Sequence, residues 1–188
     1  MIGNDIVDLR YAKNSKWQHP RFLEKVFTLC EQELIIQSSN RFSTIWQLWA
    51  IKEAAYKAYL QKYPSRFFNS KAFICCNLSS LTEVSYNDFR IKVQSVINTN
   101  IVYAETISQK PVYRKILKVL PDHKFQSKQI RQALISKVSE QLNIDKKSLT
   151  VRKDRAGIPN VYLENSKLKA ALSITHHGDY AAYSISYS

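Results

Sequence analysis

Glycine is scarce in this 188-residue sequence, which holds three glycines, at positions 3, 157 and 178. At an ordinary usage of ~7%, a chain of this length would carry about 13. Walker-type phosphate loops, dinucleotide-binding fingerprints and the Gly-x-Ser-x-Gly elbow of hydrolases all need glycine at fixed spacings. The sequence contains none of these motifs, which excludes the corresponding sites. The glycines that remain mark points where φ is positive or where another group approaches the backbone.

Long apolar runs and a cysteine framework are also missing. No stretch approaches the ~18 apolar residues of a membrane span, so we expect no membrane partner. The N-terminus reaches Asp5 at once and lacks the basic start and apolar stretch of a signal peptide. The three cysteines, Cys30, Cys75 and Cys76, are odd in number and two are adjacent. They are interpreted as reduced core thiols of a cytoplasmic protein.

Positive charge, by contrast, is abundant. The chain carries 28 Lys and Arg against 15 Asp and Glu, a net charge of +13. This balance favours a polyanionic partner: nucleic acid, an anionic membrane, a phosphorylated cofactor or an acidic protein. The basic residues gather in segments 110–118, 124–131 and 146–155, which are interpreted as solvated faces of ordered elements.

Local patterns predict an α+β chain. Apolar spacing and capping signals predict helices from Pro20, from Thr28 (a capping box with Glu31), over 46–59 (opened by Thr44 and Gln47), and from Ser127. Alternating β-branched stretches predict strands over 3–9, 73–78, 90–97, 101–107, 112–119, 149–152, 160–163, 170–175 and 180–187. In the last strand, Ser184 and Ser186 are expected to face outward. We therefore predict a single domain over residues 1–188, with an antiparallel sheet packed against helices.

Two short segments of the sequence carry acidic side chains that need an explanation. Asp5 and Asp8 flank an apolar strand, and Glu53 precedes Lys57 by one helical turn. The acids near the N-terminus have an ordinary explanation as caps or lysine partners, and Glu53–Lys57 as an i,i+4 pair. However, Glu53 lies among apolar neighbours, and a buried unpaired carboxylate is costly. A Mg²⁺ ion fits this pattern, since it takes one or two carboxylates together with phosphate oxygens.

Two histidines, His176 and His177, precede Gly178 at the predicted end of a strand. Adjacent residues of a strand point to opposite faces, so the two are poorly placed to share one metal ion. No cysteine or histidine at zinc spacing supports them. A single histidine at this position suits hydrogen bonding to a phosphate.

Five segments follow one another in the chain: Gly3-Asn4-Asp5-Ile6-Val7-Asp8, Arg21–Thr28 with Glu31, Trp49–Lys57, Ala156-Gly157-Ile158-Pro159 and Ser173-Ile174-Thr175-His176. In this order they resemble the Gly-x-Asp-Ile-Val-Glu segment, the stretch after it, the Trp-x-x-Lys-Glu-Ala-x-x-Lys motif, the Gly-Lys-Pro turn and the Ser-x-Ser-His strand end of the 4'-phosphopantetheinyl transferase superfamily. The order is that of its holo-(acyl-carrier-protein) synthase branch. The third segment is the most specific of the five.

The resemblance implies a fold and a reaction: transfer of the phosphopantetheine arm of coenzyme A to a serine of an acidic acyl or peptidyl carrier protein. Asp5 and Glu53 are then the Mg²⁺ ligands, with Asp5, Glu53 and Lys57 catalytic. Glu53, directly or through a metal-bound water, is the candidate base for the attacking serine, and Lys57 stabilises the charge that develops. The coenzyme A contacts implied are Lys52, Lys57, Gly157, Pro159, Ser173, Thr175 and His176.

The sequence also departs from the family pattern. Ile158 replaces the cation usual in the Gly-Lys-Pro turn, and His177 stands where a small or acidic residue is more usual. Val7 stands where members of the two-lobed branch carry a second carboxylate that binds the metal. The metal is then expected to have two protein ligands only, or to recruit Asp8 as another. The resemblance further implies a β-rich insertion around residues 71–125.

In the two-lobed members of the family the site lies between two similar halves, whereas this sequence carries each motif once. The resemblance therefore implies a homo-oligomer, with a trimer favoured, in which His176 of one protomer lies near Asp5 and Glu53 of the next. Inserted strands that complete the site within one chain are the alternative. Two other functions stay open: a family member that has lost catalysis, and a basic non-enzymatic module that binds an acidic protein or nucleic acid. Acids beside a basic helix argue against nucleic acid as the partner.

Overall fold

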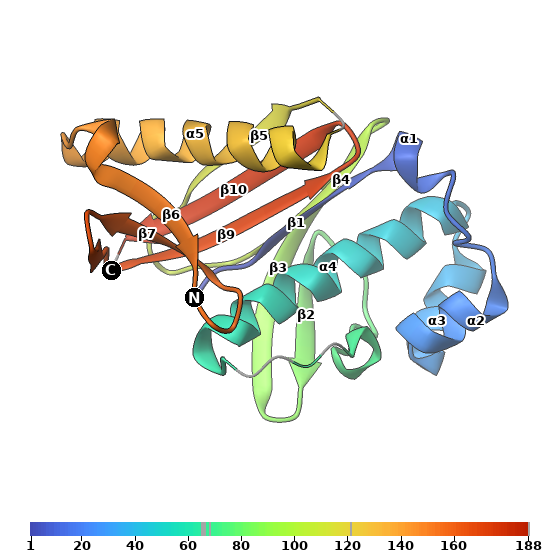
Figure 1. Cartoon of the computed structure of the whole chain (residues 1–188). Coiled ribbons are helices and arrows are strands. Elements are labelled where there is room, and N and C mark those ends of the chain that lie inside the picture. Colours follow the sequence, from blue (N-terminus) through green and yellow to red (C-terminus); the bar gives the residue numbers. More distant parts are fainter. Residues whose placement is uncertain (65–66, 68, 121, 188) are drawn as a thin grey trace.

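The computed structural model describes residues 1–187 apart from 65–66, 68 and 121. The structure does not describe the side chains of His123 and Lys124. The prediction that segment 124–131 is a solvated face is therefore not tested at Lys124. The described chain contains three antiparallel sheets and two long helices (Figure 1). The predicted α+β class, with antiparallel sheets packed against helices, is confirmed.

The first half of the chain forms a four-stranded sheet with a helix across one face. The strand order is β1-β4-β3-β2, with β1 Asn4–Asp8, β2 Leu81–Tyr86, β3 Phe89–Ile97 and β4 Ile101–Thr106. Short helices α1 Leu9–Ala12, α2 Pro20–Val26 and α3 Leu29–Gln37 lead into the long helix α4 Arg41–Lys62, and η1 is Ser70–Ala72. The apolar face of α4, which includes Ile51, Ala54 and Ala58, packs on Val7, Val93 and Ala104 of the sheet.

The second half contains two small sheets and the other long helix. One sheet has the order β5-β10-β9, with β5 Tyr113–Lys118, β9 Ala170–His177 and β10 Tyr180–Tyr187. The other has the order β6-β7-β8, with β6 Leu149–Lys153, β7 Pro159–Leu163 and β8 Ser166–Lys167; η2 is Lys146–Ser148. Helix α5 His123–Leu142 lies along this half, and its Ile130, Leu134 and Val138 pack against Leu172 and Ile185 (Figure 1).

Strands β1 and β9 lie side by side where the two halves meet (Figure 1). In each half the first strand pairs antiparallel with the last, β1 with β4 and β5 with β10. Residues 81–118, within the predicted insertion, supply β2, β3 and β4 of the first sheet and β5 of the second. The insertion itself stays a prediction.

Several local predictions were wrong. Helix α4 begins earlier, since Asn40 is its N-cap and the Thr44 hydroxyl donates to the Asn40 carbonyl inside the helix. Helix α5 likewise begins at His123 and not at Ser127. Residues 73–78 form one isolated bridge, Ile74 with Ser85, and the neighbouring strand β2 was missed.

Strand β10 is buried on both faces, so the outward placement of its serines was also wrong. Ser184 and Ser186 are 0% and 4% exposed. The strand lies between β5 and β9, with α5 on one face and β1 close to it. A buried hydroxyl needs a partner, and Ser184 donates to the carboxylate of Glu105.

The cysteine prediction was wrong for two of the three residues. Cys30 and Cys76 form a disulfide, which joins α3 to the segment before β2. Cys75 keeps a free, buried thiol, and burial raises its pKa to about 12. None of the described helices has the length and hydropathy of a membrane-spanning segment.

Candidate active site at the β1–β9 junction

Strand β1 lies directly against α4 because residue 3 has no side chain. A Cβ at Gly3 would fall 1.9 Å from the Ala54 carbonyl oxygen. Side chains alternate along β1, and Val7 belongs to the core beneath α4. Asp5, two residues earlier, therefore points to the same side, toward α4.

The Asp5 carboxylate has two partners, one from each half of the chain. Lys57 Nζ lies 2.7 Å from Asp5 Oδ1, and the Thr175 hydroxyl donates to the same oxygen at 2.8 Å. Lys57 Nζ also donates to the Asn4 carbonyl at 3.0 Å. Among the described residues, no hydrogen bond reaches Asp5 Oδ2. That oxygen remains available to a further ligand.

Glu53 stands one helical turn before Lys57 and is half-buried. Burial and the neighbouring Asp5 carboxylate raise the pKa of Glu53 to about 7, while Lys57 lowers it in part. No hydrogen bond or ion pair of the Glu53 carboxylate occurs within the described part of the chain. The ionised form of Glu53 is therefore disfavoured by burial and by repulsion from Asp5. A cation bound between the two carboxylates would remove this repulsion.

The donor set fits a hard divalent cation held by two carboxylates. The described residues contain no group of three or more His, Cys, Asp or Glu that could hold a metal ion. Mg²⁺ does not need one, since it usually takes one or two carboxylates and fills its other positions with water and phosphate oxygens. Asp5 and Glu53 are thus the residues that would hold it.

Asp8 is used elsewhere. Its Oδ1 accepts from the Arg10 and Tyr11 amides as the cap of α1, and its Oδ2 accepts from the Asp179 amide at 2.8 Å. Gly178 (φ +56°) turns tightly over this carboxylate, where an added Cβ would meet Oδ2 at 2.4 Å. Asp8 is therefore a structural carboxylate and not a third metal ligand.

A cationic cleft opens beside the carboxylates, between α4, α5 and the β6–β7 turn. Five of the predicted site residues line it: Lys57, Gly157, Pro159, Ser173 and His176. The lining also includes Ser127, Arg131 and Lys153, which the sequence did not place in the site. The two cations lie in segments interpreted as solvated faces. Lys153 comes four residues before Gly157, and Arg131 is the neighbour of buried Ile130 on α5; these positions were the available signal.

The two histidines separate as the strand geometry predicted. His176 lines the cleft, whereas His177 Nδ1 accepts from the Asp8 amide at 3.0 Å. Ser173 and Thr175 share the face of His177: Ser173 Oγ accepts from the Asn4 amide at 3.0 Å, and Thr175 Oγ1 accepts from the Ile6 amide at 3.4 Å. Thr175 thus touches β1 and Asp5 and is not among the cleft-lining residues.

Comparison with known proteins identifies the family of this chain. The sequence model of the 4'-phosphopantetheinyl transferase superfamily matches residues 1–102, more than half of the chain. The chain belongs to this superfamily. No curated protein matches the sequence. The crystal structure of Thermotoga maritima holo-[acyl-carrier-protein] synthase is similar to this chain, with 14% identity, 86% of this chain and 81% of that chain covered, and a TM-score of 0.42. The superfamily match includes Asp5, Glu53 and Lys57.

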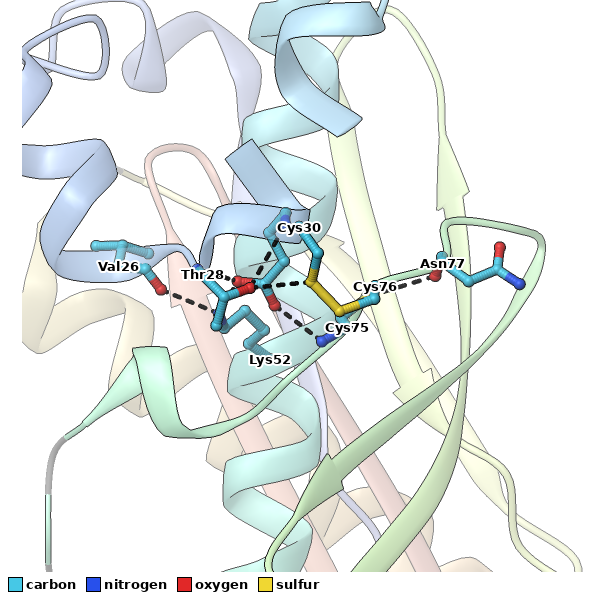
Figure 2. The surroundings of a disulfide bond; sticks show 8 residues. Val26, Thr28, Cys30, Lys52, Cys75, Cys76 and Asn77 are labelled. Atoms are coloured by element: carbon cyan, nitrogen blue, oxygen red, sulfur yellow. Dashed lines mark hydrogen bonds and ion pairs between the residues drawn. A yellow bond between two sulfur atoms is a disulfide. The ribbon is translucent and has the colours of Figure 1, made fainter. Parts of the chain in front are cut away.

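Lys52 does not belong to the site of this transferase, so its predicted coenzyme A contact was wrong. Its side chain is 1% exposed and its ammonium pairs with Glu31 Oε2 at 2.6 Å. It also donates to the Val26 carbonyl at 3.0 Å (Figure 2). Burial lowers the pKa of Lys52, and Glu31 opposes that shift. Lys52 points from α4 toward α3, on a different side from Glu53 and Lys57.

The site is assembled within one chain. Asp5 and Glu53 come from the first half, and Thr175 and His176 come from the last strands of the same molecule. The expectation that His176 reaches these acids from a neighbouring protomer was therefore wrong, because β9 of the same chain lies beside β1. The oligomeric state stays a prediction.

Proposed function

We propose that this phosphopantetheinyl transferase acts as a holo-(acyl-carrier-protein) synthase: it transfers the 4'-phosphopantetheine arm of coenzyme A to a serine hydroxyl of an apo acyl or peptidyl carrier protein. The other product is adenosine 3',5'-bisphosphate. The observation that carries the proposal is the pair of neighbouring carboxylates, Asp5 and Glu53, at the edge of a cleft lined by Lys57, Arg131 and Lys153.

The cleft suits the phosphates of coenzyme A. Three cationic side chains and His176 supply charge and hydrogen bonds to phosphate oxygens. Ile158 takes the place of a cation in the Gly157–Pro159 turn, and Arg131 and Lys153 bring positive charge to the same cleft from α5 and β6. Cations from other elements therefore supply the positive charge that Ile158 does not.

Glu53 is the proposed general base. In its ionised form, which a cation beside it stabilises, its carboxylate is the group that accepts a proton. It takes the proton of the carrier serine as the serine oxygen bonds to the pantetheine phosphorus. The bond from that phosphorus to the bridging pyrophosphate oxygen breaks, and the bisphosphate leaves.

Lys57 and Asp5 complete the arrangement. Lys57 holds the Asp5 carboxylate in place and adds positive charge next to the departing phosphate. A Mg²⁺ ion bound by Asp5 and Glu53 would neutralise charge on the pyrophosphate as the anhydride breaks. The basic surface, with a net charge of +13, favours encounter with an acidic carrier.

The test is labelling of purified apo carriers with fluorescent coenzyme A, in Mg²⁺ and in EDTA. We expect at least one acyl or peptidyl carrier to be labelled in Mg²⁺ only, and its serine-to-alanine variant to stay unlabelled. Glu53→Gln should lower the rate by about 10²–10⁴-fold, whereas Glu33→Gln, an exposed acid on α3, should leave it unchanged. No labelling across a panel of fatty-acid, polyketide and peptide carriers would reject the proposal.

Calorimetric titration with coenzyme A and Mg²⁺, together with the labelling assay, distinguishes the proposed enzyme from a family member that has lost catalysis. Such a protein would bind coenzyme A with Mg²⁺ and transfer nothing, whereas the proposed enzyme does both. A gel shift at low ionic strength that disappears steeply with salt would favour a nucleic-acid partner instead.

A further inference from the structure

Strands β1 and β9 run in the same direction and are joined by side chains. The amides of Asn4, Ile6 and Asp8 donate to Ser173 Oγ, Thr175 Oγ1 and His177 Nδ1, at 3.0, 3.4 and 3.0 Å. Every second residue of β1 thus pairs with every second residue of β9, in the same chain direction. The other edge of β1 carries an ordinary antiparallel ladder with β4. The side chains of β9 therefore take over a role that backbone carbonyls fill in a sheet.

The middle rung extends to the active site. Thr175 is 5% exposed, and its hydroxyl accepts from the Ile6 amide while donating to Asp5 Oδ1 at 2.8 Å. With Lys57 on the same oxygen, Oδ1 is held from two sides. This fixes the carboxylate rotation that leaves Oδ2 for a cation.

The last rung fixes the end of the strand. His177 Nδ1 accepts a hydrogen bond, so this nitrogen carries no proton and the ring is neutral. Burial lowers the pKa of His177, with Asp5 and Asp8 opposing the shift, which agrees with a neutral ring. Tyr11 packs edge-on against the same ring, with centroids 6.5 Å apart. His177 is thus held between α1 and β1 and away from the cleft that His176 lines.

We propose that Thr175 and His177 are positioning residues: through β1 they set the Asp5 carboxylate toward Glu53, and they do not contact coenzyme A. The inference rests on the proposed function for its catalytic readout only. It assigns a role to His177, which departs from the family pattern, and it changes the role expected for Thr175.

Four variants and one control test the proposal. Thr175→Val keeps the shape and removes the hydroxyl, and Thr175→Ser restores it. His177→Ala removes the acceptor, while His177→Asn places an amide oxygen at the position of Nδ1, the same number of bonds from Cα. The control is Thr150→Val, since the buried Thr150 hydroxyl has no hydrogen-bond partner within the described chain.

Calorimetric titration with Mn²⁺ is the first readout. Because partners that orient a metal ligand typically contribute 10–100-fold to affinity, we expect Thr175→Val to weaken Mn²⁺ binding about tenfold. Thr175→Ser and Thr150→Val should stay near the unaltered protein. Equal weakening by both valine variants, or no Mn²⁺ binding by the unaltered protein, would overturn the proposal.

Amide hydrogen exchange and kinetics complete the test. The Asp8 amide should exchange faster in His177→Ala and recover protection in His177→Asn; unchanged exchange in the alanine variant would overturn the proposal. With a carrier that is labelled, Thr175→Val should lower kcat at constant KM for coenzyme A, and a rise in KM alone would also overturn it. If no carrier is labelled, the proposed function fails, while Mn²⁺ affinity and exchange still decide this inference.

Discussion

The hydroxyl of Thr175 donates to the carboxylate of Asp5 at 2.8 Å across a separation of 170 residues. This contact joins the first strand of the chain to one of its last. Lys57 on α4 reaches the same carboxylate, so three separate elements meet at one oxygen. The site depends on the packing of the two halves and not on any one segment.

Glu53 should make the metal-free protein less stable as pH rises. Its folded-state pKa, about 7, lies above its ordinary value of 4.5 because the ionised form is disfavoured by burial and by Asp5. The resulting loss of unfolding free energy is absent below about pH 4.5, grows as pH rises and reaches its full value above about pH 7. We expect Glu53→Gln in EDTA to match the unaltered protein at low pH and to exceed it in urea midpoint at pH 8. A difference that does not vary with pH would contradict the assignment.

Cation binding should release a proton. At pH 7, a carboxyl with a pKa of about 7 is half protonated, and a cation that binds its ionised form displaces about 0.5 proton. Titration of Mg²⁺ in buffers with different ionisation enthalpies measures this number. Glu53→Gln should release none from this position, and equal release by both proteins would place the cation elsewhere.

Lys52 and Lys57 should fail in different ways. Lys52→Met leaves Glu31 buried without its cation, which typically costs about 3–5 kcal/mol of unfolding free energy. Lys57→Met removes a half-buried partner of Asp5, and we expect slower transfer with a smaller loss of stability. Urea unfolding and the labelling assay measure the two effects. Weaker coenzyme A binding by folded Lys52→Met would instead place Lys52 in the coenzyme site.

The disulfide is testable by thiol counting. Denatured protein prepared without reductant should show one reactive thiol, from Cys75, and three after reduction. Opening the Cys30–Cys76 loop, which spans 46 positions, should cost about 4 kcal/mol on the chain-entropy account. The variant pair Cys30→Ser and Cys76→Ser measures this loss. Three thiols before reduction would show that the bond is absent.

Local patterns predicted the bounds of two strands of the first sheet well. Strands β3 and β4 agree within two residues with the alternating stretches 90–97 and 101–107. The prediction failed for β10, whose serines alternate with apolar residues as on an exposed face. Helix α5 covers one face of β10, and β1 and β4 of the first sheet cover the other. Sequence alternation carries no information on which elements pack against a strand.

The candidate site was predicted in residue type better than in direction. Motif spacing identified Asp5, Glu53 and Lys57, which the fold does bring together. The motif placed both Lys52 and Lys57 in the site, although residues five positions apart lie on different sides of a helix. Arg131 and Lys153 were missed, since which basic residues line a cleft depends on how α5 and β6 pack on β9.

The central claim is that Asp5 and Glu53 share one cation beside the bound coenzyme. Anomalous diffraction from crystals grown with Mn²⁺ and coenzyme A tests it most directly. We expect one Mn²⁺ peak in contact with Asp5 Oδ2 and the Glu53 carboxylate of the same chain, with the pyrophosphate oxygens as further ligands. A structure with coenzyme A in the cleft and no Mn²⁺ peak between these two carboxylates would contradict the account.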